Sequence, residues 1–133
     1  LQLVEFNTLV AKLTSTYDWD AIVLGLTGSM DPHFGQNVWR SWGQLHLWNP
    51  QQKKPATEWE KRVDAIFEAA GQELDEDRRK AYYDEYQKIV AQELPVIYTA
   101  LGARLTAVKN RFGNLNPAPF GGVFHNIEEI YIK

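Results

Sequence analysis

The stretch TEWEKRVDAIFEAAGQELDEDRRKAYYDEYQKIVAQELP (residues 57–95) carries the strongest secondary-structure signals of the chain. It opens with a capping box, because the Thr57 side chain can accept a hydrogen bond from the Glu60 amide while the Glu60 carboxylate reaches back. The apolar residues that follow recur at helical spacing and form one stripe: Trp59, Val63, Ile66, Phe67 and Ala70. Gly71 is placed to end this first helix in a left-handed turn.

A second helix is predicted from about Asp75 to about Glu93. Pro95 stops it, because proline disfavours the helical conformation in the residue before it. The charged run ELDEDRRK (residues 73–80) is expected to be a solvated face. The residues expected to point inward are Tyr82, Tyr86, Ile89 and Val90.

Strand-like segments flank this helical pair. LQLVEF (residues 1–6) predicts a short strand, followed by a helix over NTLVAKL (residues 7–13) with Asn7 as its N-cap. WDAIVLGL (residues 19–26) is nearly all apolar, as in a strand covered on both faces and therefore central and parallel. Three further strands are predicted after the helices, at PVIYTA (95–100), ARLTAVK (103–109) and IEEIYIK (127–133). The predicted fold class is α/β, a mixed sheet flanked by helices.

Length and composition favour one domain spanning residues 1–133, since 44% of the residues are hydrophobic. The net charge is −3 and the 14 Lys and Arg residues are scattered, which argues against nucleic acid as a partner. The longest apolar run, residues 21–26, is too short to cross a bilayer, so no membrane-inserted segment is expected. The strand-like pattern at residue 1 suggests a piece of a longer polypeptide.

Catalytic and metal-binding motifs are not recognisable in the sequence. The three histidines, His33, His46 and His125, are too far apart to predict a metal site, and no cofactor is expected. Asp31 follows the apolar run of residues 19–26, at the end of a strand where ligands of open α/β sheets tend to bind. Asp before Pro is also a common turn opener, so a turn and a ligand contact are both open for Asp31.

The segment SMDPHFGQNVWRSWGQLHLWNP (residues 29–50) concentrates aromatic surface in a region without helical or strand periodicity. Indole is costly to leave in water, so each ring is either packed against its own fold or covered by a ligand. Trp39, Trp42 and Trp48 are therefore candidate binding residues.

Several motifs together carry a resemblance to a known family. They are YDWDAIVLGLTGSMDP (residues 17–32), ELPVIYTALGARLTAVKNRFGNL (residues 93–115), and between them the series Asp75, Arg79, Tyr83, Gln87 and Pro95. The chain resembles the C-terminal portion of the family 5 extracytoplasmic solute-binding proteins, the peptide, oligopeptide and nickel receptors of ABC importers. The resemblance implies a fragment of the C-terminal lobe of a type II periplasmic-binding-protein fold over residues 1–133, without its N-terminal lobe.

The resemblance also implies a function without catalysis. Two lobes close over a small solute, expected to be peptide-like, and the closed form docks on the transmembrane permease. The expected location is periplasmic or extracytoplasmic, either free or lipid-anchored. Arg79 is expected to pair near its own helix and a neighbouring loop, with Tyr83 and Gln87 packed under the sheet. The expected substrate-binding residues are Ser29, Asp31, His33, Trp39, Trp42 and Trp48.

Two other functions compete with the receptor hypothesis. Five tryptophans suggest a carbohydrate-binding module whose aromatic platforms stack on sugars, although such a module is expected to be all-β. Asp31 and His33 suggest a hydrolase or transferase in which they form an acid–base pair. The chain by itself is expected to bind solute weakly or not at all, because one lobe supplies half of the contacts.

Overall fold

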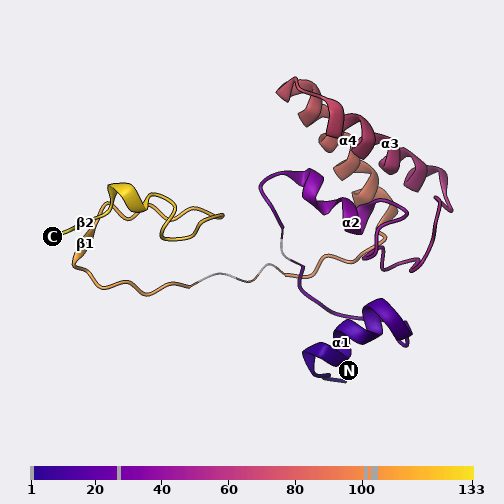
Figure 1. Cartoon of the computed structure of the whole chain (residues 1–133), viewed down its shortest axis with the longest axis horizontal. Helices are drawn as coiled ribbons and strands as arrows, with labels where there is room; N and C mark the ends of the chain where they lie inside the picture. Colours follow the sequence, from indigo (N-terminus) through magenta and orange to yellow (C-terminus); the bar gives the residue numbers. More distant parts are fainter. Residues whose placement is uncertain (1, 27, 101, 103–104) are drawn as a thin grey trace. The chain divides into compact units, whose positions relative to one another are not determined.

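The computed structural model describes residues 2–26, 28–100, 102 and 105–133, and the chain divides into two compact units, Leu1–Ile97 and Tyr98–Lys133. The first unit is helical (Figure 1). Its elements are α1 (Phe6–Ala11), the π-helix η1 (Lys12–Thr16), the 3₁₀-helix η2 (Pro32–Gly35), α2 (Gln36–Trp39), α3 (Glu58–Gln72) and α4 (Glu76–Glu93). The second unit holds β1 (Phe112–Gly113), the 3₁₀-helix η3 (Ile127–Glu129) and β2 (Tyr131–Ile132).

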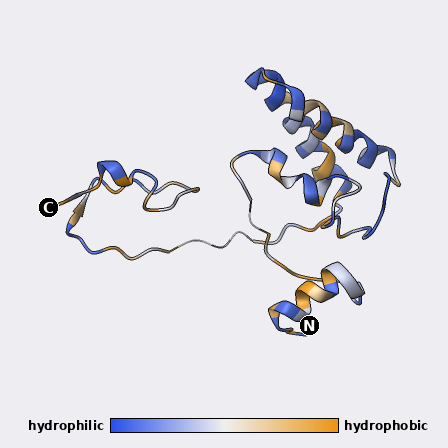
Figure 2. Cartoon of the chain, in the orientation of Figure 1, coloured by the Kyte–Doolittle hydropathy of each residue, from blue (hydrophilic) through white to orange (hydrophobic). Residues whose placement is uncertain are grey.

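The α3–α4 pair builds the core of the first unit, and the capping-box prediction for α3 is confirmed. Thr57 Oγ1 accepts from the Glu60 amide at 3.2 Å, while the Glu60 carboxylate accepts from the Thr57 amide at 2.9 Å. Both helices carry hydrophilic and hydrophobic residues side by side (Figure 2), as amphipathic helices do. The predicted stripe of α3 is buried at Val63, Ile66, Phe67 and Ala70, and Trp59 is half-buried.

The second predicted helix is confirmed as α4. The Asp75 side chain caps it by accepting from the Arg78 amide at 2.9 Å, and Leu94 ends it in a left-handed conformation, φ 49°, directly before Pro95. Tyr86 and Val90 are buried as predicted, while Tyr82 and Ile89 are only partly buried. Tyr83 is buried as well, and it meets Phe67 edge-on with ring centroids 5.7 Å apart.

The predicted end of α3 at Gly71 is wrong. Gly71 lies inside the helix, which continues to Gln72, and it does not adopt a positive φ. A Cβ built at Gly71 would lie 2.9 Å from Cε1 of His33, a separation too short for real side-chain contacts. This glycine therefore makes room for the His33 ring of η2 on α3.

The predicted mixed sheet, and with it the α/β fold class, is contradicted. Within the described residues the named strands are β1 and β2, two antiparallel strands in which Phe112 pairs with Ile132 and Gly113 with Tyr131. The last predicted strand is shortened to β2, because η3 occupies its first residues. A lobe built on a mixed sheet flanked by helices is therefore not the fold of the described chain.

The other predicted strands are wrong for one physical reason. Within the described residues, backbone 21–26, 95–100 and 105–109 has no strand partner, and an unpaired strand leaves its amide and carbonyl groups without ladder bonds. Ala103 and Arg104 of the fourth predicted strand lie outside the described residues. At the start of the chain, Phe6 belongs to α1, and the side chain of Glu5 caps this helix in place of the predicted Asn7.

Within the described residues no helix is long and apolar enough to cross a membrane. This agrees with the prediction that the chain has no membrane-inserted segment.

Candidate functional site

Asp31 ties the start of η2 to helix α4. One carboxylate oxygen accepts from the His33 amide at 2.9 Å, which caps η2, and both oxygens accept from Nη2 of Arg79 at 2.9 and 2.8 Å. The hydrogen bond from the His33 amide, assisted by Arg79, lowers the pKa of Asp31 in spite of partial burial. Arg79 also donates from Nε to the Ala70 carbonyl at 3.0 Å. Asp31 therefore opens and fastens a turn, and Arg79 pairs with a neighbouring loop as expected.

The His33 side chain packs against the helical pair. Its Nδ1 lies 3.1 Å from the hydroxyl oxygen of Tyr83, and its ring centroid lies 6.1 Å from that of Phe67. Burial raises the pKa of Tyr83, against the lowering effect of Arg79. Asp31 thus contacts the backbone of His33, and both side chains bind residues of α4, Arg79 and Tyr83. The acid–base pairing of the enzyme hypothesis has no direct side-chain contact to support it.

The remaining predicted binding residues lie in different environments. Ser29 is exposed in an irregular segment. Trp39 packs against the core, edge-on to Tyr86 at a centroid distance of 5.3 Å. Trp42 is 50% exposed, and the Arg40 guanidinium lies 4.6 Å from its ring centroid. A ligand role for these residues stays a prediction.

Glu60 is the centre of a buried polar network. The sequence predicted only its part in the capping box, and none of its other partners. Glu60 is 2% exposed, and its Oε1 accepts from Trp48 Nε1 and from Gln52 Nε2, each at 3.1 Å. His46, which is 1% exposed, places Nε2 3.1 Å from the same oxygen. The other oxygen accepts from the amides of Ala56 and Thr57 at 2.7 and 2.9 Å.

This network determines the charge state of Glu60. Burial by itself raises the pKa of a carboxyl group, but the hydrogen bonds from His46, Trp48, Gln52 and the Ala56 amide outweigh burial and lower the pKa of Glu60 to about 2. One ionised carboxylate therefore holds four residues of the loop that precedes α3 against the N-terminus of that helix, where negative charge is favoured.

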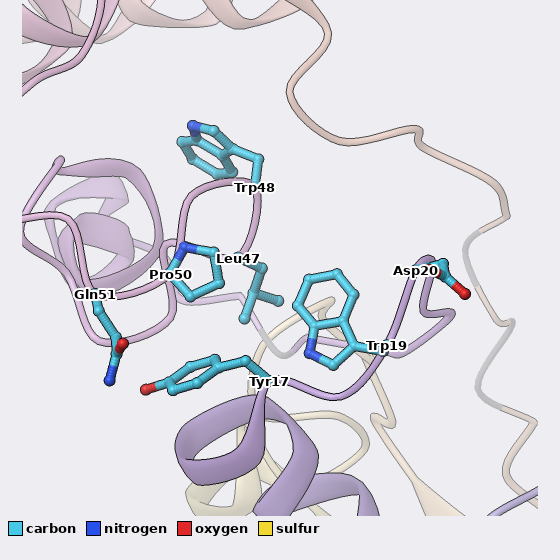
Figure 3. A pocket seen from close by; sticks show the side chains of 7 residues that line it. All are labelled: Tyr17, Trp19, Asp20, Leu47, Trp48, Pro50 and Gln51. Carbon is cyan, nitrogen blue, oxygen red and sulfur yellow. The ribbon is translucent and has the colours of Figure 1, made fainter.

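The same loop forms one wall of a pocket of about 450 Å³. Figure 3 shows Tyr17, Leu47, Pro50 and Trp19 around this space, with Gln51 and Asp20 at opposite ends and Trp48 beyond Leu47. The lining residues come from two segments of the first unit, Tyr17, Trp19 and Asp20 and then Leu47, Trp48, Pro50 and Gln51.

The polar atoms of the pocket's aromatic rings are bonded to the chain itself. The Tyr17 hydroxyl donates to the Thr14 carbonyl at 3.0 Å, and Nε1 of Trp19 donates to the Lys12 carbonyl at 3.2 Å. Trp48 donates to Glu60. Of the residues that line the pocket, only Trp48 is among the binding residues predicted from the sequence. The aromatic pair Tyr17 and Trp19, two residues apart in YDWD, was the available signal for the opposite wall.

The described residues hold no group of three or more His, Cys, Asp or Glu side chains that could bind a metal ion. No protein-family model, curated protein or solved structure matches the chain.

Proposed function

We propose that the chain is part of the substrate-binding component of an ABC importer, which captures a small, peptide-like solute and delivers it to the membrane permease. The support from sequence is the resemblance of residues 17–32, of residues 93–115 and of the Asp75–Pro95 series to family 5 solute-binding proteins. Two structural features are consistent with this proposal. Residues 17–32 and 93–115 expose apolar side chains, and Asp31 of the first segment forms an ion pair with Arg79 of the Asp75–Pro95 series.

The observation that carries the proposal is apolar surface exposed on irregular backbone. Val23 is 75% exposed and Ile97 is 86% exposed, and neither segment pairs with another strand in the described part of the chain. Large apolar side chains such as these two are costly to leave in water. A further polypeptide that covers them is what the receptor hypothesis supplies, in the form of the remaining N-terminal lobe.

The loop that the proposal assigns to the solute has a fixed end and an exposed tip. Asp31 is held by Arg79 and by the His33 amide, while Ser29 and Met30 directly before it are exposed, Met30 by 79%. A loop fastened at its base can present backbone groups to a ligand at a small cost in conformational entropy. Ser29 is the substrate-binding residue of this tip, and Asp31 positions it.

The mechanism is capture and release without covalent chemistry. The solute binds between two lobes, its binding free energy favours the closed form, and the closed form docks on the transmembrane permease. The place of action is extracytoplasmic, with the full-length protein either free or held by a lipid anchor. The carbohydrate-binding alternative requires an all-β chain, whereas α3 and α4 form the core here.

The test uses native mass spectrometry with an equimolar mixture of di- to pentapeptides. The polypeptide that carries this sequence in its natural source is expected to be several hundred residues long, as two lobes require, and to retain peptide. The 133-residue chain is expected to retain none. Micromolar peptide affinity of the 133-residue chain, or a natural polypeptide that binds oligosaccharides and no peptide, would contradict the proposal.

A further inference from the structure

The aromatic pocket of the first unit has the chemistry of a cation-binding site. We propose that the pocket formed by Tyr17, Trp19, Leu47, Trp48 and Pro50 binds an alkylammonium group through aromatic ring faces. This site is separate from the loop tip at Ser29, and it does not depend on the proposed transport function. The pocket volume of about 450 Å³ leaves room for a small organic cation with an apolar body.

Hydrogen bonds to the chain itself fix the orientation of the pocket's aromatic rings. The hydroxyl of Tyr17 and the indole nitrogens of Trp19 and Trp48 all donate to acceptors of the chain itself. Tyr17 and Trp19 therefore offer the pocket carbon surface, with little hydrogen-bonding capacity left for a ligand, while the Trp48 ring also packs against His46, whose ring centroid lies 3.8 Å away. The face of an aromatic ring is negative, so it attracts a cation and does nothing comparable for a neutral hydroxyl.

The charge at the pocket is negative. Among the described residues that line the pocket there is no Lys or Arg, and the one charged side chain is the carboxylate of Asp20 at one end (Figure 3). Within the described residues Asp20 has no ion pair, whereas neighbouring Asp18 is paired with Lys12 at 2.8 Å. The pocket is thus complementary to a positive charge.

One wall of the pocket is held in place before a ligand arrives. Trp48 is fastened to the ionised Glu60, which also anchors the adjoining residues Gln52, Ala56 and Thr57. Leu47 beside Trp48 is buried. A wall fixed by several hydrogen bonds loses little freedom on binding, which favours affinity for a small ligand.

The experiment compares choline with 3,3-dimethylbutan-1-ol, an alcohol of nearly the same shape without the charge. Each is titrated into the 133-residue chain while the indole N–H resonances of the tryptophans are followed by NMR. Choline is expected to shift the resonances of Trp19 and Trp48 and to bind at least about fivefold more tightly than the alcohol, the ratio that a single cation–π contact of ordinary strength provides.

Variants distinguish binding to the face of an aromatic ring from binding to any apolar surface. Trp19→Leu is expected to weaken choline binding at least about threefold and to leave the alcohol unaffected. Phe34→Leu, at an exposed aromatic residue outside the pocket, is the matched control and is expected to change neither affinity. Asp20→Asn is expected to weaken choline binding up to about threefold at low salt, and less at high salt, because the carboxylate acts through solvent.

Folding of each variant is checked by far-UV circular dichroism. Asp20→Asn is expected to leave the packing intact, because Asp20 is exposed. Equal affinities for choline and the alcohol would overturn the proposal in favour of a merely apolar pocket. So would unchanged choline binding in Trp19→Leu, or resonances that do not move up to the solubility limit of choline.

Discussion

Glu60 shows how much one side chain can organise. As the third residue of α3 it completes a capping box, and in the same position it accepts hydrogen bonds from Trp48 and Gln52 of the preceding loop. A buried carboxylate is tolerated because each of its two oxygens accepts hydrogen bonds, Oε1 from Trp48 and Gln52 and Oε2 from the amides of Ala56 and Thr57. Replacing it leaves several buried donors without an acceptor, which is costlier than the loss of any single bond.

Glu60→Gln is predicted to destabilise the first unit by roughly 3 kcal/mol at neutral pH, since the pKa of Glu60 falls from 4.5 to about 2 on folding. A carboxyl group whose pKa is lowered by folding stabilises the protein above its unfolded pKa. This stability is lost as the pH falls from about 4.5 to about 2. Urea unfolding at pH 7 and at pH 3 should therefore show the gap between wild type and Glu60→Gln shrinking in acid.

The control for this prediction is Glu93→Gln, at an exposed residue at the end of α4, which should change stability by less than about 0.5 kcal/mol at either pH. A gap between wild type and Glu60→Gln that stays constant from pH 7 to pH 3 would show that the carboxylate is not held ionised by the network.

At the scale of elements, η2 lies on the α3–α4 pair through three specific contacts. Asp31 is paired with Arg79, the His33 ring hydrogen-bonds to Tyr83, and the same ring approaches Gly71 where a side chain would obstruct it. Glycine inside a helix costs about 0.5–1 kcal/mol relative to alanine. Close packing of η2 is the physical reason that this cost is accepted.

Gly71→Ala is predicted to act with opposite signs in two backgrounds. With His33 present, the new methyl group displaces the ring and destabilises the unit by about 1–3 kcal/mol, as overpacking does. In a His33→Ala background the obstruction is gone, and Gly71→Ala should stabilise the unit by about 0.5–1 kcal/mol through helix propensity. Urea unfolding of the four proteins measures the coupling. The same sign in both backgrounds would mean that His33 does not lie on Gly71.

At the scale of the whole molecule, the buried apolar residues are unevenly shared between the two units. Within the described residues the hydrophobic core cluster runs from Val63 to Val90, and each of its members belongs to the first unit. The second unit is held by the β1–β2 pair and by polar contacts such as the Asn126 side chain donating to the Asn114 carbonyl at 2.9 Å. Cooperative stability is therefore expected to reside in the first unit.

Removing residues 98–133 is predicted to shift the melting temperature of the first unit by less than about 3 °C, because the core cluster Val63–Val90 of that unit stays complete. A peptide of residues 98–133 alone should show no cooperative melting, since chains shorter than about 40 residues without disulfides or metals rarely fold. Circular dichroism melts of both fragments check this. A large drop in the melting temperature of residues 1–97 would show that the second unit stabilises the first.

At the candidate site, the local interactions could be predicted from the sequence, whereas contacts between residues distant in sequence could not. The turn-opening role of Asp31 follows from its place before Pro32, and its side chain caps η2. Its bond to Arg79 joins residues 48 positions apart, and here the family resemblance implied a neighbouring loop without naming Asp31. The aromatic pair Tyr17 and Trp19 marks one wall of the pocket in the sequence, but only the tertiary structure joins this wall to the loop before α3.

The sequence by itself determined α3 and α4, the capping box at Thr57 and the buried stripe of α3, because helical hydrogen bonds and apolar periodicity are local. The tertiary structure alone decided the fate of the apolar segment 21–26, the partners of Glu60 and the reason for glycine at position 71. Strand pairing and burial of a polar side chain both depend on residues distant in sequence. An apolar run without a pairing partner remains irregular, however strand-like its composition.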